Sequence, residues 1–305
     1  MKRTAAAAGS SRYAQEAAEE YLHAGGDAVG AAVTGFFAAA GQAAGVLFGP
    51  VGLLIAQVGV GVRAFDGRTR QPGLTLRRPR GLGPDESPTA AARVAAPSGI
   101  AALSVALRYG QSASLSKVIA AGVNLAKQAG FERRAGVLEQ IARLGAAALS
   151  APGIARELIH VAGPSVGGTL GAADLAAIPD VDQPARSVGS TRLAPWSEQR
   201  LDARYSAEAG WREQAIRQQG LCVCDARGGV AALCYDDVAE GLHVEALELL
   251  LPLAAIPPRW GVARVAPGQM LPAPTPLAIE VSEHGIPLSA AVHLEGRAAL
   301  IVHSA

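Results

Sequence analysis

The sequence predicts an α+β fold in which helices come first and an antiparallel sheet follows. Helical patterns fill most of the first 180 residues, and strand-like alternation fills the last third of the chain. Half of the 305 residues are hydrophobic, which is enough to bury a large core. Helices and strands that are segregated rather than alternating favour α+β layering over repeated βαβ units.

The first elements are predicted from apolar spacing and capping residues. A helix near the N-terminus is interrupted at Gly25-Gly26. Asp27 is a suitable N-cap for a second helix over 28–42, whose small and apolar residues on all sides indicate complete burial. After a glycine-rich loop, residues 53–65 are predicted to form one core strand, with Asp66-Gly67 as the turn behind it.

The remaining elements follow from breaker residues and alternation. Residues 68–95 are rich in Arg, Pro and Gly and predict an irregular loop, whereas the Pro-rich segment 179–197 predicts a linker. Further helices are expected over 98–109, 114–128, 133–150, 152–161 and 198–218, and strands over 221–224, 230–235, 277–281, 287–293 and 298–303.

These elements divide the chain into three parts. Residues 1–178 form a helix-rich region, residues 179–197 a linker-like segment, and residues 198–305 a short helix followed by strands. We expect the parts to form one composite domain, because the strands of the last part need the helices of the first to cover them.

Composition excludes several classes of function. The formal net charge is +1 and aromatic residues are 4%, so neither a basic nor a base-stacking surface for nucleic acid is predicted. The uncharged run 28–62 is long enough to cross a bilayer. Its glycines and Pro50 favour a buried helix, loop and strand instead, so no membrane association is expected. Without a secretory core near the N-terminus, a cytoplasmic protein is expected.

The cysteines do not indicate a disulfide framework or a metal site. Cys222, Cys224 and Cys234 are odd in number and clustered, which favours buried thiols in a reducing compartment. The C-x-C spacing has no second pair, and the six histidines are scattered without ligand spacing. Neither a metal nor a cofactor is therefore expected.

Several short motifs, in the right order, resemble those of the gamma-glutamyltransferase family. They resemble the family's Gly-Gly-Asn-Ala-Val, Leu-Asp-Gly-Arg, Val-Pro-Gly, Arg-Tyr-Gly, Ala-x-x-Gly-Phe and Pro-Asp-Leu-Ala stretches. The resemblance implies an N-terminal-nucleophile-hydrolase fold, a layered αββα sandwich, here in truncated form. The matching residues are Gly25-Gly26-Asp27-Ala28-Val29, Phe65-Asp66-Gly67-Arg68, Ala96-Pro97-Ser98-Gly99, Arg108-Tyr109-Gly110, Ala126 to Phe131 and Ala173-Asp174-Leu175-Ala176.

The resemblance also implies where the nucleophile should lie. In the family, self-cleavage frees an N-terminal threonine within a sequence like Thr-Thr-His-x-Ser-Val-Val-Asp-x-x-Gly. With Asp225 to Gly228 as the Asp-x-x-Gly, Gln219 falls at the nucleophile position and Cys222 at the serine. A glutamine amide is not a nucleophile, so the chain is predicted to be inactive and uncleaved. Cys222 is the alternative nucleophile, although three positions along a strand place it on the opposite face.

Two other site features are carried over from the family. Its oxyanion motif, Pro-Leu-Ser-Ser-Met-x-Pro, falls near Met270 to Pro276, where Pro272 and Ala273 replace the paired serines. The arginine that matches Arg68 binds the α-carboxylate of the glutamyl substrate in the family, and the accompanying glutamate is Thr69 here. Arg68 either keeps such a carboxylate pocket or pairs with a carboxylate of the chain itself.

Three functions stay open at this point. The first is an inactive gamma-glutamyltransferase-like protein that serves as an accessory subunit of a larger complex or self-associates, because the shortening would expose apolar surface. The second is an active gamma-glutamyl amidohydrolase or transferase on glutathione-like substrates that uses Cys222 or another nucleophile. The third is a module that binds amino-acid carboxylates or gamma-glutamyl compounds through Arg68.

Overall fold

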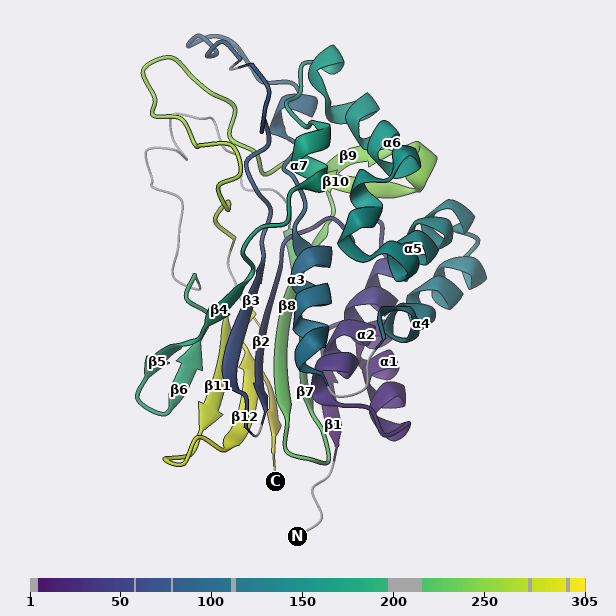
Figure 1. Cartoon of the computed structure of the whole chain (residues 1–305), viewed down its shortest axis with the longest axis vertical. Helices are drawn as coiled ribbons and strands as arrows, with labels where there is room; N and C mark the ends of the chain where they lie inside the picture. Colours follow the sequence, from purple (N-terminus) through teal and green to yellow (C-terminus); the bar gives the residue numbers. More distant parts are fainter. Residues whose placement is uncertain are drawn as a thin grey trace.

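Two stacked β-sheets form the centre of the computed structural model, and helices cover the outer face of one of them (Figure 1). The α+β fold class is confirmed. Among the residues described, the helices lie on one side only, so three layers of the expected four are seen (Figure 1). The structure describes residues 5–57, 59–77, 79–110, 114–196, 216–273, 276–294 and 297–304.

The first sheet is antiparallel and has its strands in the order β1-β7-β8-β2-β3-β4. Along β2, Leu53 and Ile55 face the helices, whereas Leu54 and Ala56 face the second sheet. Because both faces are buried, this strand is apolar as far as Gln57. The strands are β1 (Ala6–Gly9), β2 (Val51–Gln57), β3 (Gly61–Gly67), β4 (Asp182–Pro184), β7 (Ile216–Cys224) and β8 (Val230–Val238).

The second sheet packs on the first through small and branched side chains. Its order is β13-β12-β11-β6-β5, and Ile279 and Val292 from its inner face share one core with Cys222 and Cys234 of the first sheet. The strands are β5 (Arg186–Val188), β6 (Thr191–Leu193), β11 (Leu277–Val281), β12 (Pro287–Val292) and β13 (Leu300–His303). A separate two-stranded sheet pairs β9 (Gly241–Val244) with β10 (Leu249–Pro252).

The helical layer is built around α2 (Ala28–Gln42), which is buried over all but its last residue, as predicted. No helix in the described part of the chain is long and apolar enough to cross a membrane. The other helices are α1 (Arg12–His23), α3 (Gly99–Ala106), α4 (Leu115–Gln128), α5 (Glu132–Leu144), α6 (Pro152–Ala162) and α7 (Ala172–Ala176), with 3-10 turns η1 (Ala91–Arg93), η2 (Leu107–Tyr109), η3 (Gly145–Ser150), η4 (Pro164–Val166) and η5 (Glu245–Leu247).

The single core strand predicted over 53–65 is wrong, because this region forms the hairpin β2–β3. Gly59 and Gly61 have φ values of +85° and +81° and form its turn, a conformation that favours glycine. The pair Asp66-Gly67 therefore ends β3 rather than forming a turn after it. A continuous apolar run conceals such a turn because neither strand alternates.

The prediction that 179–197 is an irregular linker is also wrong. This segment supplies β4 to the edge of the first sheet and β5 and β6 to the second, so it joins the two layers. Pro184 is tolerated in β4 because an edge strand needs no N–H on its outer side. Most of the helix expected over 198–218 lies outside the described residues, and its last three positions belong to β7.

Candidate functional site

The turn of the β7–β8 hairpin contacts the start of α2. The Asp225 carboxylate accepts hydrogen bonds from the backbone N–H groups of Arg227 (2.8 Å), Gly229 (2.9 Å) and Ala28 (2.9 Å). Asp27 caps the same helix by accepting from the N–H of Gly30 at 2.8 Å. Two motifs that are about 200 residues apart in the sequence therefore meet, and together they satisfy N–H groups that a helix start leaves open.

Gln219 lies in β7 opposite Tyr235 of β8. Its side-chain oxygen accepts a hydrogen bond from the Ser10 hydroxyl at 2.6 Å, and the same hydroxyl accepts from the N–H of Gly220 at 2.9 Å. The amide is thus held by the segment that follows β1. The two threonines of the family's motif align with Gln218 and Gln219. Whichever of the two is matched to the nucleophile, the side chain here carries no hydroxyl.

Cys222 faces the second sheet, whereas its neighbours Leu221 and Val223 face the helices. The thiol is fully buried and donates to the carbonyl oxygen of Leu300 at 3.3 Å. Burial raises the pKa of Cys222 to about 12. Because the thiolate is the reactive form, this sulfur is a poor nucleophile at neutral pH.

Arg68 follows β3 and is almost completely buried. Both oxygens of Asp66 accept from its guanidinium, at 2.9 Å from Nε and 2.8 Å from Nη2. The guanidinium carbon also lies 5.5 Å from the centre of the Trp196 ring. Arg68 therefore pairs with a carboxylate of the chain itself, and its contact with a ligand carboxylate stays a prediction.

The segment that matches the family's oxyanion motif lies directly beside Arg68. The N–H of Leu271 donates to the carbonyl of Thr69 at 2.8 Å, and Met270 bridges to Arg70. Pro272 has no N–H to offer to an oxyanion. The positions of Pro274 and Thr275 lie outside the described residues.

Asp236 is a buried acid that sequence reasoning missed. It lies in β8 opposite Gln218, next but one to Cys234, and is 2% exposed. Within the described part of the chain, its Oδ2 atom has no hydrogen-bond partner, and the same holds for the buried indole Nε1 of Trp196. Burial raises the pKa of Asp236 to about 7. The signal available in the sequence was an acidic residue that directly continues an apolar strand.

Asp236 should make the fold less stable as the pH rises. An unfolded Asp ionises near pH ~3.9, whereas burial raises the pKa of Asp236 to about 7. Between these values the unfolded chain releases a proton that the folded chain keeps, so the free energy of unfolding falls by up to roughly 1.4 kcal/mol per pH unit. Above pH 7 the loss is complete.

Urea unfolding between pH 5 and pH 8 checks this expectation. Asp236→Asn should lose this part of the pH dependence and gain most, relative to the parent chain, at pH 8. The matched control is Asp85→Asn, because Asp85 is exposed. An equal slope in the parent chain and Asp236→Asn would contradict the assignment.

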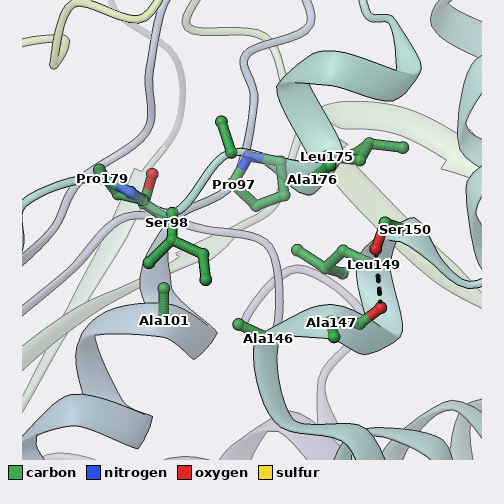
Figure 2. Close-up of a pocket in the computed structure, with 12 residues that line it drawn as sticks. Pro97, Ser98, Ala101, Ala146, Ala147, Leu149, Ser150, Leu175, Ala176 and Pro179 are labelled. Atoms are coloured by element: carbon green, nitrogen blue, oxygen red, sulfur yellow. Dashed lines mark hydrogen bonds between the residues drawn. The ribbon is translucent and has the colours of Figure 1, made fainter.

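A cavity of about 70 Å³ lies away from these residues, between the start of α3, η3 and the segment that follows α7 (Figure 2). Its two serines are already engaged: the Ser98 hydroxyl accepts from Arg70 Nε at 2.8 Å, and the Ser150 hydroxyl donates to the carbonyl of Ala147 at 3.0 Å. None of its lining residues comes from β7 or β8. We therefore assign it no part in the site.

The described residues show no group of three or more His, Cys, Asp or Glu side chains that could hold a metal ion. The stacked sheets and the helical layer give the chain the fold of the N-terminal-nucleophile hydrolases, in the form seen in gamma-glutamyltransferase-like structures.

Comparison with solved structures supports this fold over most of the chain. A structure of LmbA matches with a TM-score of 0.67 and 17% identity, covering 95% of this chain and 79% of that one. Cephalosporin acylase from Bacillus halodurans matches with a TM-score of 0.66, 14% identity and coverage of 95% and 78%. Gamma-glutamyltranspeptidase from Helicobacter pylori matches with a TM-score of 0.50, 20% identity and coverage of 61% and 68%. No protein-family model and no curated protein matches the sequence.

Proposed function

We propose that this chain is a non-catalytic gamma-glutamyltransferase-like protein that stays uncleaved and acts as an accessory subunit of a larger assembly. The observation that carries the proposal is the chemistry of β7. Gln218 and Gln219 stand where the motif has threonines, and Cys222 is buried between the sheets with a raised pKa. The strand thus offers no side chain that is both nucleophilic and accessible.

The open face of the second sheet supports the accessory role. No helix among the described residues covers this face (Figure 1). The strand pairing places Ile301 of β13 and Val188 of β5 on this face, and their side chains are 47% and 53% exposed. Exposed apolar residues on a sheet face that no described helix covers fit a surface that a partner covers.

Intact mass and turnover test the loss of catalysis. The purified protein should give one species near 30.9 kDa rather than two fragments. It should not hydrolyse a chromogenic gamma-glutamyl anilide, and Cys222→Ala should behave like the parent chain. Cleavage near residues 216–222 together with turnover, both abolished by Cys222→Ala, would instead establish the amidohydrolase alternative.

A small-ligand site between the two sheets is the second candidate. Among the described residues, Asp236 Oδ2 and Trp196 Nε1 are two buried atoms without a hydrogen-bond partner, and the Trp196 ring contacts the Arg68 guanidinium. An amino acid carries an ammonium and a carboxylate that match such groups. Calorimetric titration with glutamate should then give heat that Asp236→Asn abolishes, whereas the purely structural proposal expects no heat from either protein.

A further inference from the structure

Two loops whose sequences are rich in arginine lie at the end of the molecule opposite its termini (Figure 1). Residues 77–86 and 256–265 contain five of the chain's 27 Lys and Arg residues and only two acidic residues. Five arginines minus two acidic residues give these loops a formal charge of +3, against +1 for the whole chain. We call the surface of these two loops the Trp260 surface; its described members are Trp260, Arg77, Arg80, Arg259 and Arg264.

The two loops hold each other in place. The N–H of Leu82 donates to the carbonyl of Pro258 at 2.8 Å, and the N–H of Trp260 donates to the carbonyl of Leu82 at 3.1 Å. Arg264 Nη1 donates to the carbonyl of Pro79 at 3.0 Å. Behind the second loop, Ala255 and Ile256 pack in a small core of their own. The surface is therefore ordered before anything binds to it, which lowers the entropic cost of binding.

Trp260 projects from this fixed base and is 66% exposed. Close packing sets its position, because a Cβ at Gly81 would lie 2.6 Å from the Trp260 ring atom Cδ1. An indole that stays in water forgoes the stabilisation that apolar burial gives. No contact within the described fold requires this exposure. Tryptophan flanked by arginine is the combination that most often carries binding energy at protein interfaces.

We infer that the Trp260 surface docks an acidic segment of a partner protein. Trp260 supplies the apolar anchor, and Arg80 and Arg264, both exposed, face the partner's carboxylates. Arg80 already pairs with Glu86 at the surface, so a carboxylate of the partner takes the place that Glu86 holds in the free chain. The inference rests on the proposed accessory role and names the kind of partner.

A protein partner is favoured over nucleic acid. A nucleic-acid surface needs basic charge along an extended track and several stacking rings. Here the chain as a whole is nearly neutral, and the two loops contribute a single aromatic side chain. One exposed indole with arginines on the same two loops fits a short acidic protein segment better.

Photo-crosslinking in the native host tests the inference with the full chain. Benzoylphenylalanine replaces Trp260 in one variant and Ile178 in another, because Ile178 is also a large exposed side chain, at 73%. We expect a discrete adduct with a second protein at position 260 and none at 178. Adding Arg80→Glu and Arg264→Glu should lower the adduct yield by at least about tenfold. Adding Arg143→Glu, on the exposed side of α5, should leave it unchanged.

Four results would overturn the inference. They are no adduct at position 260, an adduct whose yield ignores the double charge reversal, an adduct that ribonuclease removes, and a covalent dimer of this chain. Intact mass and anilide turnover of the same preparations report separately on the loss of catalysis. A failure at the Trp260 surface is therefore distinguishable from a failure of the proposed function.

Discussion

Replacing Gly122 with alanine is expected to lower the free energy of unfolding by about 3 kcal/mol. Helices α2 and α4 cross in contact at this point, and a Cβ at Gly122 would lie 2.2 Å from the carbonyl oxygen of Phe37. The obstacle is backbone, so no side-chain rotation relieves it, and the two helices have to move apart. Urea unfolding followed by circular dichroism measures the loss.

Gly136→Ala is the matched control for this prediction. Gly136 also lies inside a helix, α5, but a Cβ there would meet nothing within 4 Å. Alanine should therefore stabilise the chain by roughly 0.5–1 kcal/mol through the smaller entropy of the unfolded state. If both substitutions changed stability by the same amount, the close approach of α2 and α4 would be wrong.

Asp225→Ala is expected to cost about 3–4 kcal/mol, because three backbone N–H groups would lose their acceptor at once. The loss affects both the hairpin turn and the start of α2. It should shift the urea midpoint of the whole chain rather than melt the hairpin alone, since these elements share one core.

Two substitutions control for the loss of charge and of side-chain atoms at this position. Asp225→Asn keeps one carbonyl oxygen and should fall between the parent chain and Asp225→Ala. Asp180→Ala removes an exposed carboxylate and should stay within about 0.5 kcal/mol of the parent chain. A loss below about 1 kcal/mol for Asp225→Ala would show that the turn does not depend on these hydrogen bonds.

The role of Asp225 bears on what a match to the Asp-x-x-Gly motif means. Its carboxylate accepts hydrogen bonds from backbone N–H groups in the hairpin turn and at the start of α2. These hydrogen bonds hold β7, β8 and α2 together. The fold therefore uses the Asp-x-x-Gly pattern whatever residues precede it. A match to such a pattern indicates the fold rather than the activity.

Elements with local signals could be predicted from the sequence closely. The bounds of α2 follow from the capping residue Asp27 and a run without charged residues or proline. The turn of the β7–β8 hairpin follows from its glycines, although β7 begins five residues before the predicted strand. The short strands β4, β5 and β6 could not be predicted in this way. Each has three residues, too few for alternation to appear, and their pairing partners are far away in the sequence.

The sequence by itself determined which side chains match the family's threonine pair, and neither Gln218 nor Gln219 carries a hydroxyl. Only the tertiary structure decided that Arg68 pairs with Asp66, that Cys222 is buried between two sheets, and that Asp236 is buried with an oxygen that has no partner among the described residues. The reason is physical. Residue identity fixes what a group can do, whereas its burial and its partners depend on strands that meet from distant parts of the chain.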